Sequence, residues 1–272
     1  MRSLITNNNK QNQPMTTNNQ LTIKGFFHRD DVKSKFNELM GNRSAQFITS
    51  VLSVVNNNSY LKNASPESVF SAALMAATLD LPVNPNLGFA YIIPYGQQAQ
   101  FQVGYKGLVQ LALRSGQFKT ISVTPVYEGQ IKQQNPLTGF EFDFNNKQSD
   151  KVIGYAAYFS LINGFEKTMY MTIEEVTAHG KRFSKMFNSG VWKTDFDAMA
   201  QKTVLKLLLS KYAPLSIEMQ KAVIADQAVI KDAETMDVEY VDAGQDITEA
   251  REKQSQIATA RIEKLKASTN ES

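Results

Sequence analysis

The sequence predicts an α+β fold, in which helices at both ends of the chain flank a central group of antiparallel strands. Apolar residues recur with helical spacing before residue 80 and again after residue 172, whereas residues 87–171 mostly alternate between apolar and polar. Elements of one type are thus grouped along the chain, which is typical of α+β folds. With 272 residues, the chain is long enough for one large or two small domains.

The N-terminal part is predicted to be a disordered leader followed by three helices. Residues 1–25 form the leader, because the first twenty contain six Asn and three Gln and few apolar side chains. The predicted helices cover 30–40, which ends at a glycine, 45–55 and 69–79. Ser65 and Pro66 favour the start of the third, since serine caps a helix and proline suits its first turn.

The central part is predicted to be strands around one helix. Asn163-Gly164 favours a type I′ turn and marks the clearest hairpin of the chain. The expected strands are Leu87–Tyr95, Ala99–Val103, Thr120–Tyr127, Phe140–Phe144, Val152–Ile162 and Phe165–Met171, and the expected helix is Tyr105–Ser115.

The C-proximal part is predicted to be helical. Helices are expected over Thr172–Lys185, Thr194–Tyr212 and Ser216–Asp232, then an acidic linker over 233–246 and a mostly polar helix over Ile247–Lys266. We therefore expect a core domain at 26–215 and a separate helical and acidic, partly disordered region at 216–272. Removal of the chain after Asp232 should leave the core intact.

The charge distribution points to a polyanionic partner. Residues 101–211 carry 14 Lys and Arg against 9 Asp and Glu, whereas residues 212–272 carry 7 against 12. Within the basic part, residues 181–211 hold seven basic residues and two acidic ones. A basic middle with an acidic tail favours nucleic-acid binding, although a solvated lysine-rich surface gives the same count.

Several function classes find no support in the residues. The chain has no cysteine and only two histidines, far apart in sequence, which argues against a disulfide scaffold, a thiol nucleophile and a zinc site. No phosphate-binding loop motif is present, and Glu141 and Asp143 are better explained as an exposed hairpin face than as metal ligands. We expect no catalytic residue, no cofactor and no metal. No apolar run is long enough to cross a membrane, and a cytoplasmic protein is expected.

Basic residues in three clusters, with aromatic residues between them, are the candidate DNA contacts. Basic groups track a phosphate backbone, and aromatic rings stack on bases. Taken singly, each aromatic is more simply explained as part of the core. Trp192 in particular is expected to pack on Phe196 or Met199, just before a helix capped by Thr194. The candidates are Tyr105, Lys106, Arg114, Lys119, Lys181, Arg182, Lys185, Lys193, Lys202 and Lys206.

Several ordered motifs resemble the RecT family of phage and prophage recombinases. They are Leu79-Asp80-Leu81-Pro82-Val83-Asn84-Pro85, Gly88-Phe89-Ala90-Tyr91-Ile92-Ile93-Pro94-Tyr95, Gly104-Tyr105-Lys106-Gly107-Leu108, Val126-Tyr127-Glu128-Gly129 and Trp192-Lys193-Thr194-Asp195-Phe196-Asp197 through Lys206. The resemblance covers about residues 40–215. Gln130 departs from it, because an acidic residue often stands there in the family.

The resemblance implies ATP-independent binding of single-stranded DNA and annealing of complementary strands, without a bond-breaking site. It also implies self-association into rings or helical filaments on the annealing duplex, and action in the cytoplasm of a bacterial host. A companion exonuclease and the host single-strand-binding protein are the partners that it suggests. A passive single-strand-protecting protein is the main alternative. A metal-dependent nuclease and an assembly protein that binds no nucleic acid are further ones.

Overall fold

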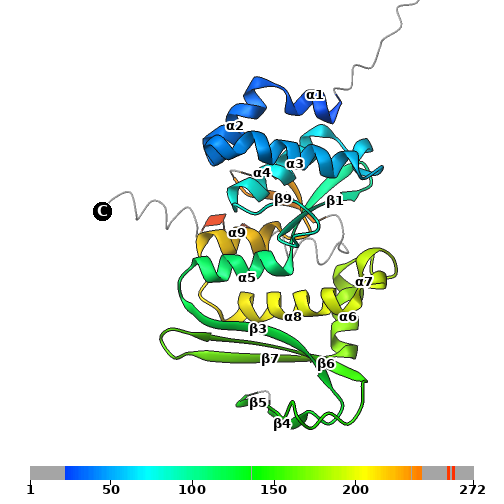
Figure 1. Ribbon diagram of the computed structural model, residues 1–272, viewed down its shortest axis with the longest axis vertical. Coiled ribbons are helices and arrows are strands. Elements are labelled where there is room, and N and C mark those ends of the chain that lie inside the picture. Colours follow the sequence, from blue (N-terminus) through cyan, green and yellow to red (C-terminus); the bar gives the residue numbers. More distant parts are fainter. Residues whose placement is uncertain (1–21, 136, 234, 241–255, 258, 261–272) are drawn as a thin grey trace, which may run out of the picture.

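A computed structural model of the chain describes residues 22–135, 137–233, 235–240, 256–257 and 259–260. It confirms the α+β fold. From one end of the molecule to the other, Figure 1 shows the N-terminal helices, a group of short strands, three helices that lie across the middle, and a larger sheet with a short hairpin beyond it. None of the helices described is both long and apolar enough to cross a membrane.

The N-terminal helices follow the predicted order. Thr22 caps the first helix by accepting a hydrogen bond from the Gly25 N–H, and Ile23 is buried, so the predicted disorder of residues 22–25 is wrong. The rest of the predicted leader, residues 1–21, lies outside the described chain. Ser65 caps the last of these helices, as predicted, with Pro66 in its first turn. The elements are α1 (Ile23–Phe27), α2 (Asp30–Met40), η1 (Gly41–Arg43), α3 (Ser44–Asn56), η2 (Leu61–Asn63) and α4 (Pro66–Thr78).

The short strands join the middle of the chain to its C-terminal part. The hairpin of β1 (Ala90–Tyr95) and β2 (Gln98–Val103) lies beside the hairpin of β8 (Val229–Asp232) and β9 (Asp237–Glu239). The Phe101 N–H donates to the Ala228 carbonyl, which ties β2 to the start of β8. Helix α4 packs against both β2 and β8.

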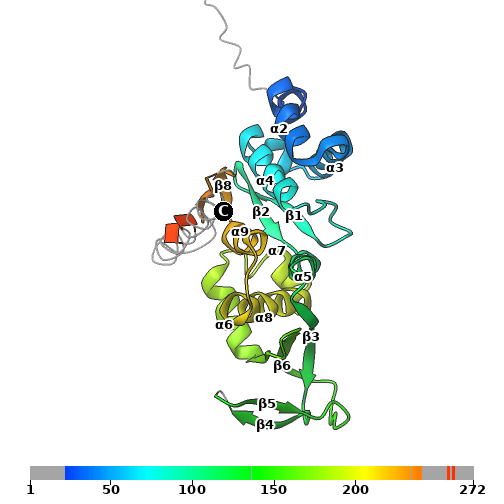
Figure 2. The ribbon, with the colours of Figure 1, turned by 90° about the vertical axis from the view of Figure 1, so that its left-hand side faces the viewer.

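The larger sheet has the strand order β3-β6-β7, formed by β3 (Phe118–Tyr127), β6 (Val152–Leu161) and β7 (Glu166–Thr172). Every pair is antiparallel, and the β6–β7 hairpin turns at the predicted Asn163-Gly164. Beyond it, β4 (Ile131–Asn135) pairs with β5 (Gly139–Phe142) (Figure 2). Strand β4 was not predicted, because four of its five side chains are polar.

Four helices complete the fold: α5 (Tyr105–Arg114), α6 (Ile173–Phe183), α8 (Phe196–Tyr212) and α9 (Ile217–Ala225), with a short unpredicted turn of helix, α7 (Gly190–Thr194). Helix α8 packs on the β3-β6-β7 sheet. Its cap is Asp195, which accepts from the Ala198 N–H, and not the expected Thr194.

The core continues beyond residue 215, where the sequence predicted its end. The expected helix over Ser216–Asp232 is wrong after residue 225, because the chain turns there into β8. Ile224, Ile230, Val238 and Tyr240 are buried in the same core as the N-terminal helices and the sheets. Residues 234, 241–255, 258 and 261–266 of the predicted linker and terminal helix lie outside the described chain, as do residues 267–272.

We predict that the chain can end after Tyr240 but not after Asp232. The shorter form loses β9 and the buried side chains of Met236, Val238 and Tyr240. It also loses the hydrogen bond that the Tyr240 hydroxyl donates to the Ile224 carbonyl at 2.6 Å. Burial of each large apolar side chain stabilises by about 1.5–3 kcal/mol. Urea unfolding should therefore show the form ending at Asp232 to be destabilised by at least about 2 kcal/mol relative to the form ending at Tyr240. Equal unfolding midpoints would contradict this account.

Candidate nucleic-acid interface

The predicted basic clusters lie on different sides of helix α8. Helices α5 and α6 both pack on α8, and the view in Figure 2 places them on opposite sides of it. Lys106 and Arg114 belong to α5, whereas Lys181 and Arg182 belong to α6. The clusters therefore do not form one continuous basic stripe.

Two glycines allow the start of α5 to pack against the residues just before β1. A Cβ atom at Gly104 would lie 2.1 Å from the Gly88 carbonyl oxygen, and one at Gly107 would lie 2.2 Å from the Phe89 carbonyl oxygen. No side chain fits at either position. The spacing Gly-Tyr-Lys-Gly thus allows the two backbone segments to pack closely. This packing fixes the position of Lys106 in the first turn of α5.

A shallow hollow on α5 brings together three of the candidate DNA contacts, Tyr105, Lys106 and Arg114. Its volume is about 590 Å³, and its lining combines aromatic and aliphatic side chains with Lys106 and Arg114. Lys106 is exposed, and Tyr105 is half-buried. Burial raises the pKa of the Tyr105 hydroxyl, so the ring presents a neutral face. The full lining is Phe89, Tyr105, Lys106, Val109, Gln110, Leu113 and Arg114.

Arg114 is engaged within the fold. Its guanidinium donates to the carbonyl oxygens of Leu79 at 2.7 Å and Asp80 at 2.8 Å, and it forms an ion pair with the Asp80 carboxylate at 3.6 Å. These carbonyls close the C-terminal end of α4, where cations are favoured by the helix dipole. The main contacts of Arg114 therefore hold α5 to α4, rather than extending into solvent as a phosphate contact requires.

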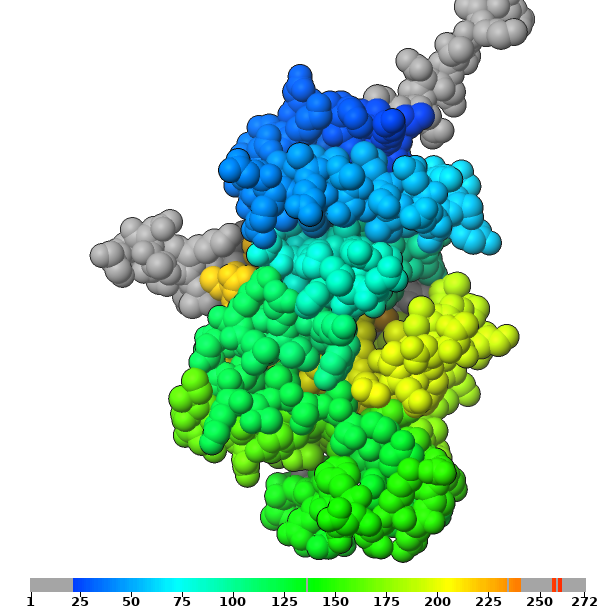
Figure 3. All heavy atoms as spheres, viewed as in Figure 1, coloured from blue at the N-terminus to red at the C-terminus, as the bar shows by residue number. Residues whose placement is uncertain are grey.

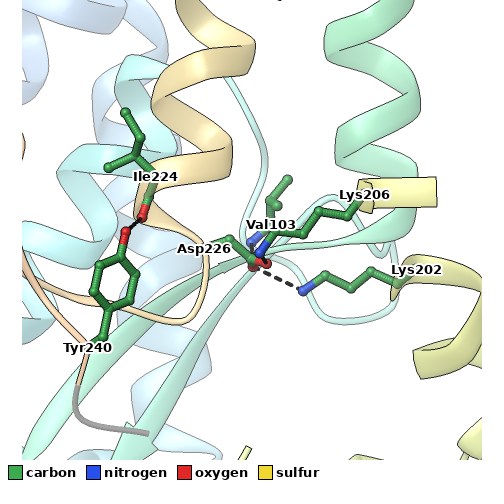
Figure 4. A network of polar contacts seen from close by, with 6 residues as sticks. All are labelled: Val103, Lys202, Lys206, Ile224, Asp226 and Tyr240. Carbon is green, nitrogen blue, oxygen red and sulfur yellow. Dashed lines mark hydrogen bonds and ion pairs between the residues drawn. The ribbon is translucent and has the colours of Figure 1, made fainter. Parts of the chain in front are cut away.

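Lys202 and Lys206 both turn into the protein and bind Asp226 (Figure 4). The Lys202 Nζ lies 3.0 Å from one carboxylate oxygen of Asp226, and the Lys206 Nζ lies 2.6 Å from the other. The Val103 N–H also donates to Asp226, at 3.1 Å. The Lys202 side chain is only 10% exposed. The structure thus corrects the expectation that these two lysines project towards phosphates.

The charge state of Asp226 follows from its surroundings. Burial opposes its ionisation, but the two lysine ammonium groups outweigh burial and lower its pKa from 3.8 to about 2. The carboxylate is therefore ionised at neutral pH, and the network is a charged triad with a backbone donor.

The α6 and α7 cluster is exposed and close to aromatic rings. The Lys181 ammonium lies 5.9 Å from the centre of the Phe187 ring, and the Arg182 guanidinium lies 5.3 Å from that of Phe183. Lys185 and Lys193 are also exposed, as is Lys119 at the start of β3. These five cations are at the surface, as the sequence predicted.

Trp192 is a structural residue, as predicted. It is 6% exposed, and its ring centre lies 5.7 Å from that of Phe196 and 5.2 Å from that of Phe187. A Cβ atom at Gly180 would lie 2.6 Å from the Phe187 ring and 3.1 Å from the Trp192 ring. Gly180 therefore lets α6 approach this aromatic group closely.

The surface is hollowed between the part formed by β1, β2 and α5 and the part formed by α6 and α7 (Figure 3). Tyr91 lies close to Lys106 in the first of these parts: a Cβ atom at Gly88 would lie 3.5 Å from the Tyr91 hydroxyl and 3.7 Å from Lys106. Burial, and to a smaller extent the charge of Asp195, raise the pKa of Tyr91. Helix α5, which carries Lys106, and helix α7, which carries Lys193, thus lie on the two sides of this hollowed face.

Sequence reasoning missed Tyr91 and Asp226. Tyr91 was quoted only as part of a motif, and its position beside Lys106 depends on the close glycine contacts. Asp226 lies 20 residues beyond Lys206, in a segment that was assigned to a separate region. One local signal was available: Lys202 and Lys206 lie on a helix whose remaining faces are largely apolar.

We predict that Asp226→Asn destabilises the fold by about 3–5 kcal/mol, because it leaves buried lysine charge without its partner. Asp150→Asn is the matched control. Asp150 also pairs with a lysine, but it is fully exposed, so its replacement should leave the unfolding midpoint nearly unchanged. Denaturant unfolding at pH 7 measures both. Equal stabilities of the two variants would contradict the structural role of Asp226.

The lowered pKa of Asp226 predicts that the stability of the fold decreases in acid. Its pKa is lower in the folded than in the unfolded chain, so its contribution is complete above about pH 4 and is lost as the pH falls towards 2. The shift corresponds to about 2 kcal/mol. Unfolding measured from pH 5 to pH 2 should show this loss in the native chain, and a smaller loss in Asp226→Asn. Identical pH profiles for the two proteins would count against it.

Comparison with known proteins agrees with the motifs. The family model described as the RecT family matches residues 45–240, which includes β8, β9 and Asp226. An uncharacterized protein of Bacillus subtilis, YqaK, is 54% identical over 206 residues, which cover 75% of this chain and 72% of YqaK. Protein RecT of Escherichia coli is 32% identical over 183 residues, which cover 61% of this chain and 65% of RecT. On these matches, the chain belongs to the RecT family.

Proposed function

We propose that the chain binds single-stranded DNA and anneals complementary strands in homologous recombination, without ATP. The observation that supports the proposal is the hollowed face between α5, which bears the exposed Lys106, and α7, which bears the exposed Lys193, together with the aromatic hollow of α5. Within the described chain, neither of these two exposed lysines forms an ion pair. Membership of the RecT family supports the same function.

The chemistry of the face suits a strand that must stay available for pairing. Lysine ammonium groups neutralise phosphates without reading the base sequence. The half-buried rings of Phe89 and Tyr105 offer flat surfaces on which bases of any type stack. A strand held mainly by its backbone keeps its base edges accessible to a complementary strand.

The finer parts of the proposal follow from the family. We propose that the annealing unit extends over residues 22–240, that several copies assemble as rings or filaments on the annealing duplex, and that the chain breaks no bonds. A companion exonuclease and the host single-strand-binding protein are its proposed partners, in the cytoplasm of a bacterial host. Lys119, Lys181, Arg182 and Lys185 are proposed to contact DNA outside the hollowed face.

We predict that Lys106→Ala and Lys193→Ala each weaken binding to all single-stranded sequences and lower the salt slope of the binding constant by about one. Lys62→Ala is the matched control, because Lys62 is exposed on η2 in the N-terminal helical part. Fluorescence anisotropy from 50 to 300 mM salt measures all three. Unchanged affinity and slope in both Lys106→Ala and Lys193→Ala would place the DNA elsewhere.

Annealing separates the proposal from a passive single-strand binder. Two complementary oligonucleotides, one with a fluorophore and one with a quencher, should pair faster with the protein than without it when ATP is absent. A passive binder would slow pairing, because it covers both strands. Electron microscopy of the same mixture tests for rings or filaments. Slower pairing, or acceleration only with ATP, would contradict annealing as proposed.

A further inference from the structure

The β1–β2 hairpin has one face in the core and one face that is partly exposed. In an antiparallel pair, residues directly opposite each other point to the same side of the sheet. The face in the core is apolar and buried, and it comprises Ala90, Ile92, Phe101 and Val103. Helix α4 packs on both strands. The opposite face of the hairpin is therefore the one that remains for a ligand.

This second face carries tyrosine and glutamine side chains. Tyr91 and Gln102 are half-buried, whereas Gln98 is exposed. Among the described residues, the Tyr91 hydroxyl and the amides of Gln98 and Gln102 form no hydrogen bond. The amide nitrogen of Gln100 between them is buried and has no acceptor. Polar groups that lack partners within the protein are suited to a polar ligand. The full face is Tyr91, Ile93 and Tyr95 of β1 opposite Gln102, Gln100 and Gln98 of β2.

The tyrosine and glutamine face is continuous with the hollow on α5. The Tyr91 ring lies against the backbone just before α5, because a Cβ atom at Gly104 would lie 3.0 Å from its Cε2 atom. The Tyr91 hydroxyl and Lys106 lie on either side of Gly88, and Lys106 lines the α5 hollow. Strands β1 and β2 also form part of one side of the hollowed surface (Figure 3). A strand whose phosphate binds Lys106 therefore passes Tyr91.

We propose that this face extends the strand-binding site, with the Tyr91 ring stacked on a base and the glutamine amides bound to phosphate and sugar oxygens. The inference rests on the proposed function. Tyrosine rings stack on bases of every type, and glutamine amides donate to phosphate and sugar oxygens without reading the sequence. Both contacts leave the pairing edges of the bases accessible to a complementary strand.

Abasic strands test the stacking contact. By fluorescence anisotropy, the native chain should bind oligothymidylate at least about fivefold more tightly than the same strand with abasic sugars, the lower end for stacking one base on a ring. Tyr91→Ala should weaken the normal strand at least about threefold and leave the abasic strand unchanged, whereas Tyr91→Phe should bind both like the native chain. Tyr60→Ala is the matched control, because Tyr60 is an exposed tyrosine in the N-terminal helical part.

Gln102→Ala tests the polar contact and removes no ring. It should weaken the normal and the abasic strand by the same factor, at least about twofold, because it removes a hydrogen bond to the backbone of the strand. The salt slope should stay unchanged, because a neutral side chain displaces no counterion, whereas Lys106→Ala should lower it. The urea midpoint of each variant is measured first. If Tyr91→Ala does not fold, Tyr91→Leu takes its place, because it keeps an apolar side chain against Gly104 without a ring.

The failure of this inference is distinguishable from the failure of the proposed function. Equal affinity of the native chain for the normal and abasic strands would overturn the inference and leave strand binding intact. An equal loss for both strands in the Tyr91 variant would do the same, as would native affinity in both the Tyr91 and Gln102 variants. A native chain that binds neither strand would refute the proposed function and this inference with it.

Discussion

The buried carboxylate of Asp226 connects three parts of the chain that are far apart in sequence. It accepts hydrogen bonds from the Val103 N–H at the end of β2 and from Lys202 and Lys206 on α8, while its own backbone leads from α9 into β8. A buried ion costs several kcal/mol unless its partners are well placed, and here both of its oxygens are bound. The position of α8 between the two groups of strands depends on this triad.

The triad also determines which basic residues remain available at the surface to bind a polyanion. Two basic residues of the segment 181–211 neutralise a buried carboxylate, and Arg114 closes the end of α4. Among the candidate DNA contacts, the lysines that remain exposed lie on α5, α6 and α7, just after α6 and at the start of β3. The basic excess seen in the sequence is therefore divided between folding and surface charge, and only the surface part is suited to holding a polyanion.

Local patterns predicted much of the fold. The Ser65 cap, the Asn163-Gly164 turn and the glycine after α2 depend on a few neighbouring residues, and all three were identified from them. The errors concern elements defined by distant partners. Residues 229–232 were assigned to a helix because their pairing with β9 and their position beside β2 cannot be seen in a local pattern. Strand β4 was missed for a different reason, because four of its five side chains are polar and give no alternation of apolar and polar residues.

The candidate site could be predicted only in part. Residue type and spacing identified Lys106, Tyr105 and Lys193 as candidates; the two lysines are exposed, and Tyr105 is half-buried. The same reasoning placed Lys202 and Lys206 with them. Two lysines four residues apart lie on one face of a helix, and this spacing is the same whether the face is exposed to solvent or packed against a buried carboxylate. The distinction required the position of Asp226, which the three-dimensional structure supplies.

Lysine reactivity tests the division between fold and surface most directly. Brief acetylation of the native chain, with and without saturating single-stranded DNA, can be mapped residue by residue by mass spectrometry. Lys106 and Lys193 should react in the free protein and be protected by DNA, Lys62 should react equally in both, and Lys202 should remain unreactive throughout. Equal labelling of Lys106 and Lys193 with and without DNA, or DNA-dependent protection of a reactive Lys202, would contradict the account.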